Sequence, residues 1–429
     1  MERTILHSDI NNCYANIELL HRPELRGKPL AVGGDPEARH GIILAKDQLA
    51  KKVGVKTGMA LWQAKKICPD IIIVPPRMDL YLRFSKMIHE IYADYTDLQE
   101  SFGIDESWLD VTDSCSLKGD GLTIAKEIRT RIRNELGITV SIGVSWNKIF
   151  AKLGSDYKKP DAITVIDKSN YKNIVWPLPA EELLYVGRAT KRKLNNYGIY
   201  TVGQLAVADT KLLKTMLGKM GIVLSIFANG EDRTPVSKEN TSPPIKSIGN
   251  STTTPRDLLN NTDIGIVIQI LAESVSARLR ENGFICNGIE ISVRDNELMC
   301  FTRQRKLYSP TDITNEIAES AMSLFVDSYK WRRPIRSIGV RAISLMNKKY
   351  PMQCDIFKSE LVRDKYMKID RVIDDIRNRF GFYSIQRGMM LCDKNLSELN
   401  AKDDHVIYPH SYMERGNLTG VNEYGGVTL

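Results

Sequence analysis

Hydrophobic and polar positions alternate along the first 165 residues in a way that predicts strands and helices in turn. Strands show the two-residue period of a half-buried sheet, and helices show apolar residues three and four apart. The order of these segments favours an α/β or α+β layer. The predicted strands are 4–10, 101–111 and 139–144, and the predicted helices are 13–20, 80–92 and 122–135.

A smaller segment, residues 22–77, interrupts this pattern. It opens with Pro23, Gly27 and Pro29, which break helical and strand periodicity. Within it, residues 44–53 and 60–67 have helical spacing on either side of a glycine-containing turn. We therefore expect residues 22–77 to be inserted into the layer formed by the rest of 1–165.

The remaining chain divides into three parts. Residues 170–232 are mostly helical and are broken by glycines, and the polar segment 238–244 carries two prolines, as linkers often do. A second α/β unit is predicted over 245–347. Its expected strands lie near 286–293 and 335–345, its expected helices near 263–282 and 312–329, and one more helix is expected over 366–380.

Composition narrows the classes of function. The 429 residues carry a net charge of +8, which weakly favours a polyanionic partner such as nucleic acid. No apolar run is long enough to span a membrane, and Asp9 interrupts the place where a signal peptide needs its apolar core. Seven cysteines without a CxxC pair are typical of a reducing compartment, so we expect a cytoplasmic protein without a membrane association.

Three acidic residues stand out in apolar surroundings. Asp9 ends one predicted strand, and Asp105 and Glu106 are adjacent in another. A ligand set of three carboxylates that includes no His or Cys suits Mg²⁺, and phosphoryl transfer with two metal ions needs such a set. The alternative is that Asp9 caps the following helix and the pair lies at a solvated strand edge. Because neighbouring strand residues point to opposite faces, at least one acid should be covered and need a cation.

Four ordered motifs resemble those of the Y-family DNA polymerases, which bypass lesions. The residues 9–18 resemble the first motif of that family, and 102–110 resemble its acidic motif. The stretch 145–155, followed by Lys158-Lys159-Pro160, is similar to the motif that closes the palm, and 50–59 resembles the fingers. Together they cover residues 1–165, and weaker similarity continues to about 345.

The resemblance implies an α/β right-hand polymerase fold. It implies a palm, small inserted fingers, a helical thumb and a C-terminal α/β little finger. The expected boundaries are palm 1–21 and 78–167, fingers 22–77, thumb 168–237, linker 238–244, little finger 245–347 and tail 348–429.

The same resemblance assigns roles to individual residues. Asp9, Asp105 and Glu106 fall on the catalytic metal ligands for two Mg²⁺ ions, with the carbonyl of Ile10 as a further ligand. Lys159 falls on a triphosphate-contacting lysine, and Tyr14 on the steric gate. A ring at that gate leaves no room for a 2′-hydroxyl, the group that separates ribose from deoxyribose.

Two fingers positions depart from the pattern. Many family members carry a tyrosine and an arginine that grip the triphosphate, whereas this sequence has Gln48 and Lys51. Lysine keeps the charge but loses the bidentate fork, so the grip should be less directional. This variation resembles the Gram-positive branch related to the polymerase V catalytic subunit.

Contacts to primer-template DNA are expected in the thumb and the little finger. The segment 182–199 resembles a helix-hairpin-helix, although an ordinary helical turn is the alternative. Such hairpins bind phosphate through backbone N–H groups and do not select sequence. The expected DNA-binding residues are Gly187, Arg188, Lys246, Arg256, Arg332 and Arg336.

The tail contains a candidate peptide for a protein partner. Residues 353–357 resemble the short segment by which bacterial polymerases hold the sliding clamp, with Gln353, Ile356 and Phe357 as the contacting residues. The alternative is a connector whose apolar pair packs on the body of the protein.

The sequence thus predicts a template-directed, error-prone lesion-bypass DNA polymerase that adds deoxynucleoside triphosphates to a primer and does not proofread. Two alternatives remain. A non-catalytic DNA-binding scaffold subunit of a lesion-bypass complex would not need all three acids. A nucleotidyl cyclase on a related palm would explain the acids but nothing after residue 170.

Overall fold

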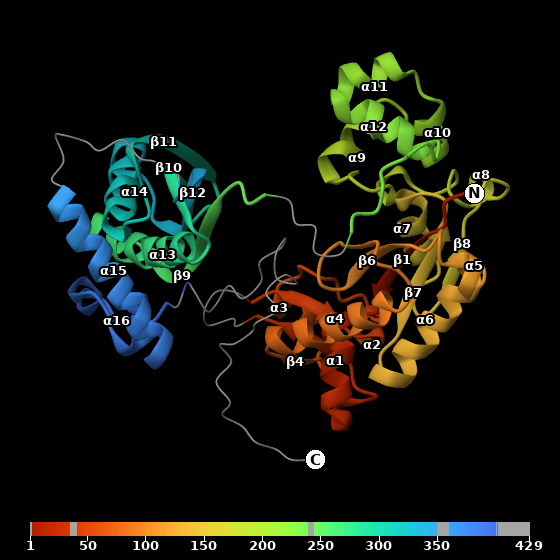
Figure 1. The fold of residues 1–429 in the computed structure, drawn as a ribbon, viewed down its shortest axis with the longest axis horizontal. Coiled ribbons are helices and arrows are strands. Elements are labelled where there is room, and N and C mark those ends of the chain that lie inside the picture. Colours follow the sequence, from red (N-terminus) through yellow and green to blue (C-terminus); the bar gives the residue numbers. More distant parts are fainter. Residues whose placement is uncertain (1, 35–40, 239–243, 350–359, 400, 402–429) are drawn as a thin grey trace. The chain divides into compact units, whose positions relative to one another are not determined.

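A computed structural model describes residues 2–34, 41–238, 244–349, 360–399 and 401 (Figure 1). These residues form two compact units, one built from 2–33 and 43–238 and the other from 244 onward. The clamp-like peptide Gln353 to Phe357 lies outside the described residues. None of the helices in the described ranges is long and apolar enough to cross a membrane.

A five-stranded sheet forms the centre of the first unit. Its order is β5-β6-β1-β7-β8, and all neighbours are antiparallel except β7 and β8. The predicted strands at 4–10 and 139–144 are confirmed. The strands are β1 (Ile5–Ile10), β5 (Gln99–Ser101), β6 (Glu106–Asp110), β7 (Val140–Ser145) and β8 (Ile163–Val165).

The prediction of one continuous strand over 101–111 is wrong. The chain turns sharply after β5, and β6 begins only at Glu106. Gly103 has a φ of +89°, a conformation that glycine adopts without the steric cost of a Cβ. Hydrophobic alternation continues through this turn, so periodicity could not reveal it. The turn places Asp105 and Glu106 at the start of a central strand.

Helices cover both faces of this sheet. The core on one face joins Leu6 and Ile142 of the sheet to Ile88 of α4 and Ile128 of α6. Helix α7 lies on the other face, where Ala151 packs with Ile5 and Trp108. The helices of this layer are α1 (Cys13–His21), α4 (Met78–Ala93), α5 (Cys115–Lys118), α6 (Gly121–Leu136) and α7 (Lys148–Tyr157).

The segment between α1 and α4 contains a small sheet of its own, in the order β3-β2-β4. The helix predicted over 44–53 is wrong in its first part, because Ile43 to Lys46 pair with β2 as a strand. Asp47 then caps a short helix by accepting from the Ala50 N–H at 2.8 Å. The elements are β2 (Leu30–Gly33), β3 (Ile43–Lys46), α2 (Gln48–Lys52), α3 (Leu61–Ile67) and β4 (Ile72–Val74).

Short helices follow β8, as the sequence predicted for 170–232. They pack around Leu194, Leu205 and Leu224. The helices are α8 (Tyr171–Ile174), α9 (Arg188–Asn196), α10 (Val202–Val207), α11 (Thr210–Leu217) and α12 (Lys219–Ala228).

The second unit has a four-stranded antiparallel sheet in the order β11-β10-β12-β9, with helices over one face (Figure 1). Two of its strands and its three long helices were predicted, the last of them over 366–380, whereas the polar strands β9 and β11 were missed. The elements are β9 (Ile248–Leu258), α13 (Asn261–Glu281), β10 (Phe284–Asp295), β11 (Cys300–Thr311), α14 (Thr314–Ser328), β12 (Ile335–Asn347), α15 (Glu360–Phe380) and α16 (Lys394–Ser397).

Helix α7 approaches β7 so closely that Gly143 has no room for a side chain. A Cβ there would lie 1.8 Å from the Ala151 carbonyl oxygen and 2.5 Å from the Ser155 nitrogen. We expect Gly143→Ala to lower the free energy of unfolding by about 2 kcal/mol or more, because backbone atoms must move. Urea denaturation measures this change.

Gly265→Ala is the matched control. Gly265 lies inside α13, and its added Cβ would meet only Met389 at an ordinary 3.7 Å. Alanine there should leave stability unchanged or raise it. Equal stabilities for wild type and Gly143→Ala would show that α7 does not rest on β7 as described.

Candidate active site

Asp9 and Glu106 lie directly opposite each other on neighbouring strands. The register between β1 and β6 pairs Asp9 with Glu106 and His7 with Trp108. Directly paired residues of an antiparallel ladder point to the same face, so both carboxylates lie on the face that α7 covers. Asp9 is only 4% exposed, and Glu106 is partly covered.

Asp105 precedes Glu106 at the end of the turn. Its backbone carbonyl accepts from the Ile10 N–H at 2.9 Å, which fixes the turn against the end of β1. Its charge raises the pKa values of Asp9, Cys13 and Tyr14, although burial is the larger cause for each. The Asp105 carboxylate is therefore close to both Asp9 and the start of α1.

Two lysines from the α7 side neutralise the facing carboxylates. The Lys159 Nζ lies 2.5 Å from Asp9 Oδ2 and 2.6 Å from Asp156 Oδ1. Lys152, one residue after Ala151 on α7, forms an ion pair with Glu106. The structure thus joins Lys159 to the acids, and it adds Lys152, which sequence motifs did not single out.

His7 completes this cluster from within β1. Its Nδ1 hydrogen-bonds Ser155 Oγ at 2.8 Å, and its Nε2 lies 3.4 Å from Glu106 Oε2. Burial lowers the pKa of His7 to about 4, so the ring is neutral near pH 7. The two-residue period of a strand placed His7 on the same face as Asp9, so alternation offered a signal that was missed.

The carboxylates respond differently to this environment. Burial raises the pKa of Asp9 to about 7, with further increases from Glu106 and Asp105 and an opposing effect from Lys159. Burial also raises the pKa of Asp105. Burial alone would raise the pKa of Glu106, but His7 and Lys152 hold it below its usual range. Separated pKa values of this kind are common in catalytic sites.

Tyr14 lies at the start of α1, next to the acids. The ring is half-buried and stacks on Tyr81 of α4, with centroids 4.4 Å apart and planes inclined by 8°. Burial raises the pKa of Tyr14 to about 12, so its hydroxyl stays protonated. One face of the predicted steric gate is therefore covered by protein.

Gln48 and Lys51 lie on α2, where Gln48 is half-buried and Lys51 is exposed. Lys46 of β3 lies close enough for the Lys51 charge to lower its pKa, after the larger effect of burial. The predicted cation at Lys51 thus has a second cation beside it, which sequence motifs did not identify.

The segment 182–199, for which a helix-hairpin-helix was predicted, carries several exposed basic side chains. Gly187 caps α9, and its backbone is extended, so glycine is not needed for conformation there. A Cβ at Gly187 would meet open space. Arg188 is exposed, as are Lys191, Arg192 and Lys193.

The four predicted DNA contacts of the second unit differ in their surroundings. Lys246 and Arg332 are exposed, and Arg336 is half-buried. The Arg256 guanidinium forms a fork with Asp263, at 2.8 and 2.9 Å, and also contacts Asp393 at 2.5 Å. Arg256 thus joins β9 to the start of α13 and to the segment before α16.

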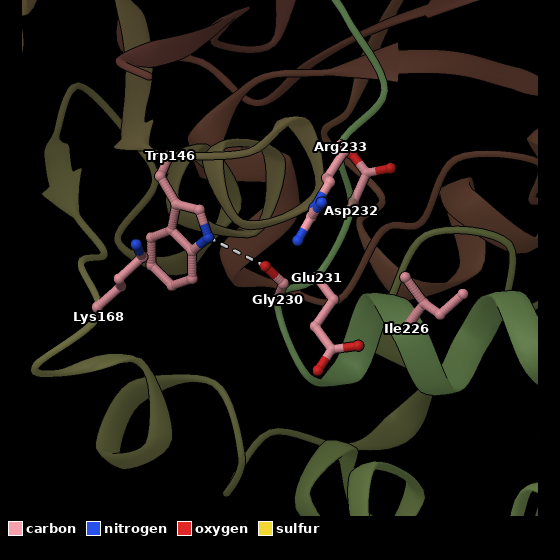
Figure 2. A pocket seen from close by; sticks show the side chains of 7 residues that line it. All are labelled: Trp146, Lys168, Ile226, Gly230, Glu231, Asp232 and Arg233. Carbon is pink, nitrogen blue, oxygen red and sulfur yellow. Dashed lines mark hydrogen bonds between the residues drawn. The ribbon is translucent and has the colours of Figure 1, made fainter. Parts of the chain in front are cut away.

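A cavity of about 440 Å³ lies away from the acids, between the start of α7 and the end of α12 (Figure 2). Across it, the Trp146 indole N–H donates to the Gly230 carbonyl at 3.0 Å. None of the residues that line this cavity is a site residue predicted from the sequence. It is lined by Trp146, Lys168, Ile226, Gly230, Glu231, Asp232 and Arg233.

The donor set at the acids fits a hard divalent cation. Its three carboxylates supply only oxygen, and burial raises the pKa values of Asp9 and Asp105 even though Lys159 opposes that rise, so a further cation would stabilise their charged forms. Among the described residues, no three His, Cys, Asp or Glu side chains already converge as a preformed metal centre. The carboxylates instead pair with Lys159 and Lys152.

Comparisons with known proteins point to a single family. The impB/mucB/samB family matches residues 8–156, and its C-terminal domain matches 245–356. A protein of Acetivibrio thermocellus named DNA polymerase IV is 50% identical over 93% of this chain and 100% of its own length. DNA polymerase IV 1 of Bacillus subtilis is 37% identical over 91% and 93%. A solved Y-family DNA polymerase chimera, Dbh-Dpo4(243-245)-Dbh, superposes with a TM-score of 0.71 at 25% identity, covering 80% of this chain and 99% of that one.

The raised pKa of Asp9 predicts an unusual effect on stability. The folded state holds a proton up to about pH 7, whereas an ordinary aspartate releases it near 3.8, so Asp9 destabilises the fold as pH rises between these values. Asp9→Asn should therefore raise the free energy of unfolding at pH 8 by on the order of 1–2 kcal/mol, after the loss of the Lys159 pair. Thermal unfolding in the presence of a metal chelator measures this change in the free energy of unfolding.

The stabilisation should shrink as the pH falls toward 3.8 and be lost below that value, where Asp9 is protonated in both states. Asp97→Asn, which alters a carboxylate with a side chain 78% exposed, is the control and should change little. A less stable Asp9→Asn at pH 8 would mean that the ion pair with Lys159 outweighs the cost of burial.

Proposed function

This chain belongs to the impB/mucB/samB family of Y-family DNA polymerases, and from that premise we propose that Asp9, Asp105 and Glu106 carry its nucleotidyl transfer. It is a DNA-directed DNA polymerase of the lesion-bypass type with the right-hand fold of that family. The observation that carries the proposal is the direct pairing of Asp9 with Glu106 beside Asp105. Both curated relatives are named DNA polymerase IV, which favours the DinB-like members over the polymerase V branch.

The family uses divalent metal ions, and we propose two Mg²⁺ ions here. Asp9, Asp105 and Glu106 would hold them, with the Ile10 carbonyl as a further ligand. Bound there, they would activate the primer hydroxyl and neutralise charge on the leaving pyrophosphate. The carboxylates orient that chemistry from the rigid ends of β1 and β6. Lys152 and Lys159 form ion pairs with Glu106 and Asp9 and so offset part of the buried charge.

Nucleotide and DNA contacts follow from the surrounding elements. Lys159 is the proposed triphosphate contact on the palm side, and Gln48 and Lys51 are those on the fingers. Lys46 beside Lys51 strengthens the local positive charge. Primer-template DNA would be bound through phosphates by the thumb residues Gly187 and Arg188, and in the little finger by Lys246, Arg332 and Arg336.

Arg256 is the least supported of the predicted DNA contacts, because Asp263 and Asp393 already neutralise it. The proposed partner peptide at 353–357 would tether the enzyme to the sliding clamp and raise its effective concentration at the primer. We further propose a cytoplasmic location, where DNA and deoxynucleotides are available.

Removing either β6 acid should abolish synthesis. We expect Asp105→Ala or Glu106→Ala to reduce primer extension with Mg²⁺ by roughly 1000-fold or more, because metal stabilisation of the transition state amounts to several kcal/mol. DNA affinity, measured by fluorescence anisotropy, should persist because it rests on phosphate contacts elsewhere.

Asp110→Asn is the matched control on the same strand. Asp110 lies at the far end of β6 and pairs with Arg3, so extension should continue near the wild-type rate. Retention of full activity in Asp105→Ala or Glu106→Ala would refute the assignment of the metal ligands.

The gate makes a separate prediction about sugar choice. Tyr14→Ala should lower the ratio of deoxynucleotide to ribonucleotide incorporation efficiency by about 10- to 100-fold, because the excluded volume disappears. The measurement is kcat/KM for each nucleotide on the same primer-template. An unchanged ratio would mean that Tyr14 serves only packing.

A further inference from the structure

Helices α1 and α4 face each other through two matched pairs of side chains. Tyr14 and Glu18 lie four residues apart on α1, and Arg77 and Tyr81 lie four residues apart at the start of α4. Side chains at that spacing share one face of a helix. The pairs meet so that Glu18 contacts both α4 residues while Tyr14 contacts Tyr81.

Glu18 is the centre of this contact. Its Oε1 accepts from Arg77 Nε at 2.9 Å and from the Tyr81 hydroxyl at 2.7 Å, and its Oε2 accepts from Arg77 Nη2 at 2.7 Å. The Glu18 side chain is fully buried. Burial would raise its pKa, but the hydrogen bonds from Arg77 and Tyr81 hold that pKa below the usual range. A forked, charge-assisted pair of this kind constrains direction as well as distance.

Tyr81 is fixed at two points as a result. Its hydroxyl is held by Glu18, and its ring is fully buried in the core of the first unit. The half-buried Tyr14 is stacked on Tyr81 with nearly parallel planes. One face of the Tyr14 ring rests on the Tyr81 ring. The orientation of the Tyr81 ring therefore sets the orientation of the Tyr14 ring.

We propose that Glu18, Arg77 and Tyr81 are positioning residues that hold the Tyr14 ring at the height and tilt needed to exclude ribonucleotides. This inference rests on the proposed role of Tyr14 as the steric gate. A gate acts through occupied volume, so a ring free to tilt would admit a 2′-hydroxyl even though no gate atom had been removed.

The position of the network along the chain adds a second consequence. Glu18 precedes the segment 22–77, and Arg77 ends it. The Glu18–Arg77 pair therefore joins the two ends of that segment at the place where the gate is held. Because the segment carries Gln48 and Lys51, sugar selection and triphosphate contact share one structural support.

The competing interpretation is that these residues simply pack α1 against α4. Variants would then lose stability and overall activity, yet the choice between sugars would not change. The ratio of deoxynucleotide to ribonucleotide efficiency separates the two interpretations, because a general loss of folded enzyme cancels from it.

The test measures that ratio in Tyr81→Leu, Tyr81→Phe and Glu18→Gln. Tyr81→Leu removes the supporting ring, and we expect the ratio to fall by about 3- to 10-fold, as the strength of a stacked aromatic pair implies. Tyr81→Phe keeps the ring and loses one hydroxyl, so it should fold and lower the ratio less. Glu18→Gln should lie between them because it weakens both contacts of the carboxylate.

Glu316→Gln is the matched control in the second unit. Glu316 accepts a similar fork from Arg363, at 2.9 and 3.3 Å, far along the chain from the gate. Its loss should cost stability without moving the ratio. An equal fall in Glu316→Gln would overturn the proposal by showing that general destabilisation relaxes sugar choice.

A double-mutant cycle shows whether Tyr81 acts through Tyr14. In the Tyr14→Ala background, Tyr81→Leu should leave the ratio unchanged, because no ring remains to be positioned. An unchanged ratio in Tyr81→Leu alone, with a collapsed ratio in Tyr14→Ala, would overturn the positioning role and keep the gate. An unchanged ratio in Tyr14→Ala would overturn the gate, and the positioning role with it.

Discussion

Three carboxylates lie within one another's electric field where β1 ends and β6 begins, and neither burial nor mutual repulsion favours their charged forms. The surrounding structure compensates for this cost. Lys152 comes from α7, Lys159 follows it, and His7 stays neutral within β1. These three groups lie on the face of the sheet that α7 covers. The packing of α7 and the electrostatic balance of the site therefore depend on each other.

Close packing is what brings the lysines to the acids. Gly143 lies beside His7 in the register and leaves α7 room to rest on β7. A side chain there would push the helix outward, and Lys152 with it. The metal-binding role proposed for the acids is compatible with these ion pairs, because a divalent cation would supply the same compensation with more charge.

The opposite face of the sheet supports the helices that hold Tyr14, the proposed steric gate. Leu6 and Ile10 pack into the core beneath α4 and α6, and α1 continues from that strand. Tyr14 and Glu18 of α1 then meet Arg77 and Tyr81 of α4. Strand β1 carries Asp9, and the short connection after it leads into α1. Asp9 and Tyr14, the ring proposed to select the sugar, are therefore joined by a few residues of chain. The segment 22–77, which carries Gln48 and Lys51, begins and ends beside this contact between α1 and α4.

Much of this protein could be predicted from its sequence, because the deciding information was local. The strands at β1 and β7, the helices α1, α4 and α6, and the three acids follow from periodicity and from charges in apolar surroundings. Motif order then indicated the family. The turn at Gly103 escaped prediction because apolar alternation runs through it, and β9 and β11 escaped because they are polar. Only the tertiary structure paired Lys152 with Glu106 and Tyr81 with Tyr14, since partners 46 and 67 residues apart in the chain leave no local pattern. Such contacts are decided by strand register and helix packing, which no single segment encodes by itself.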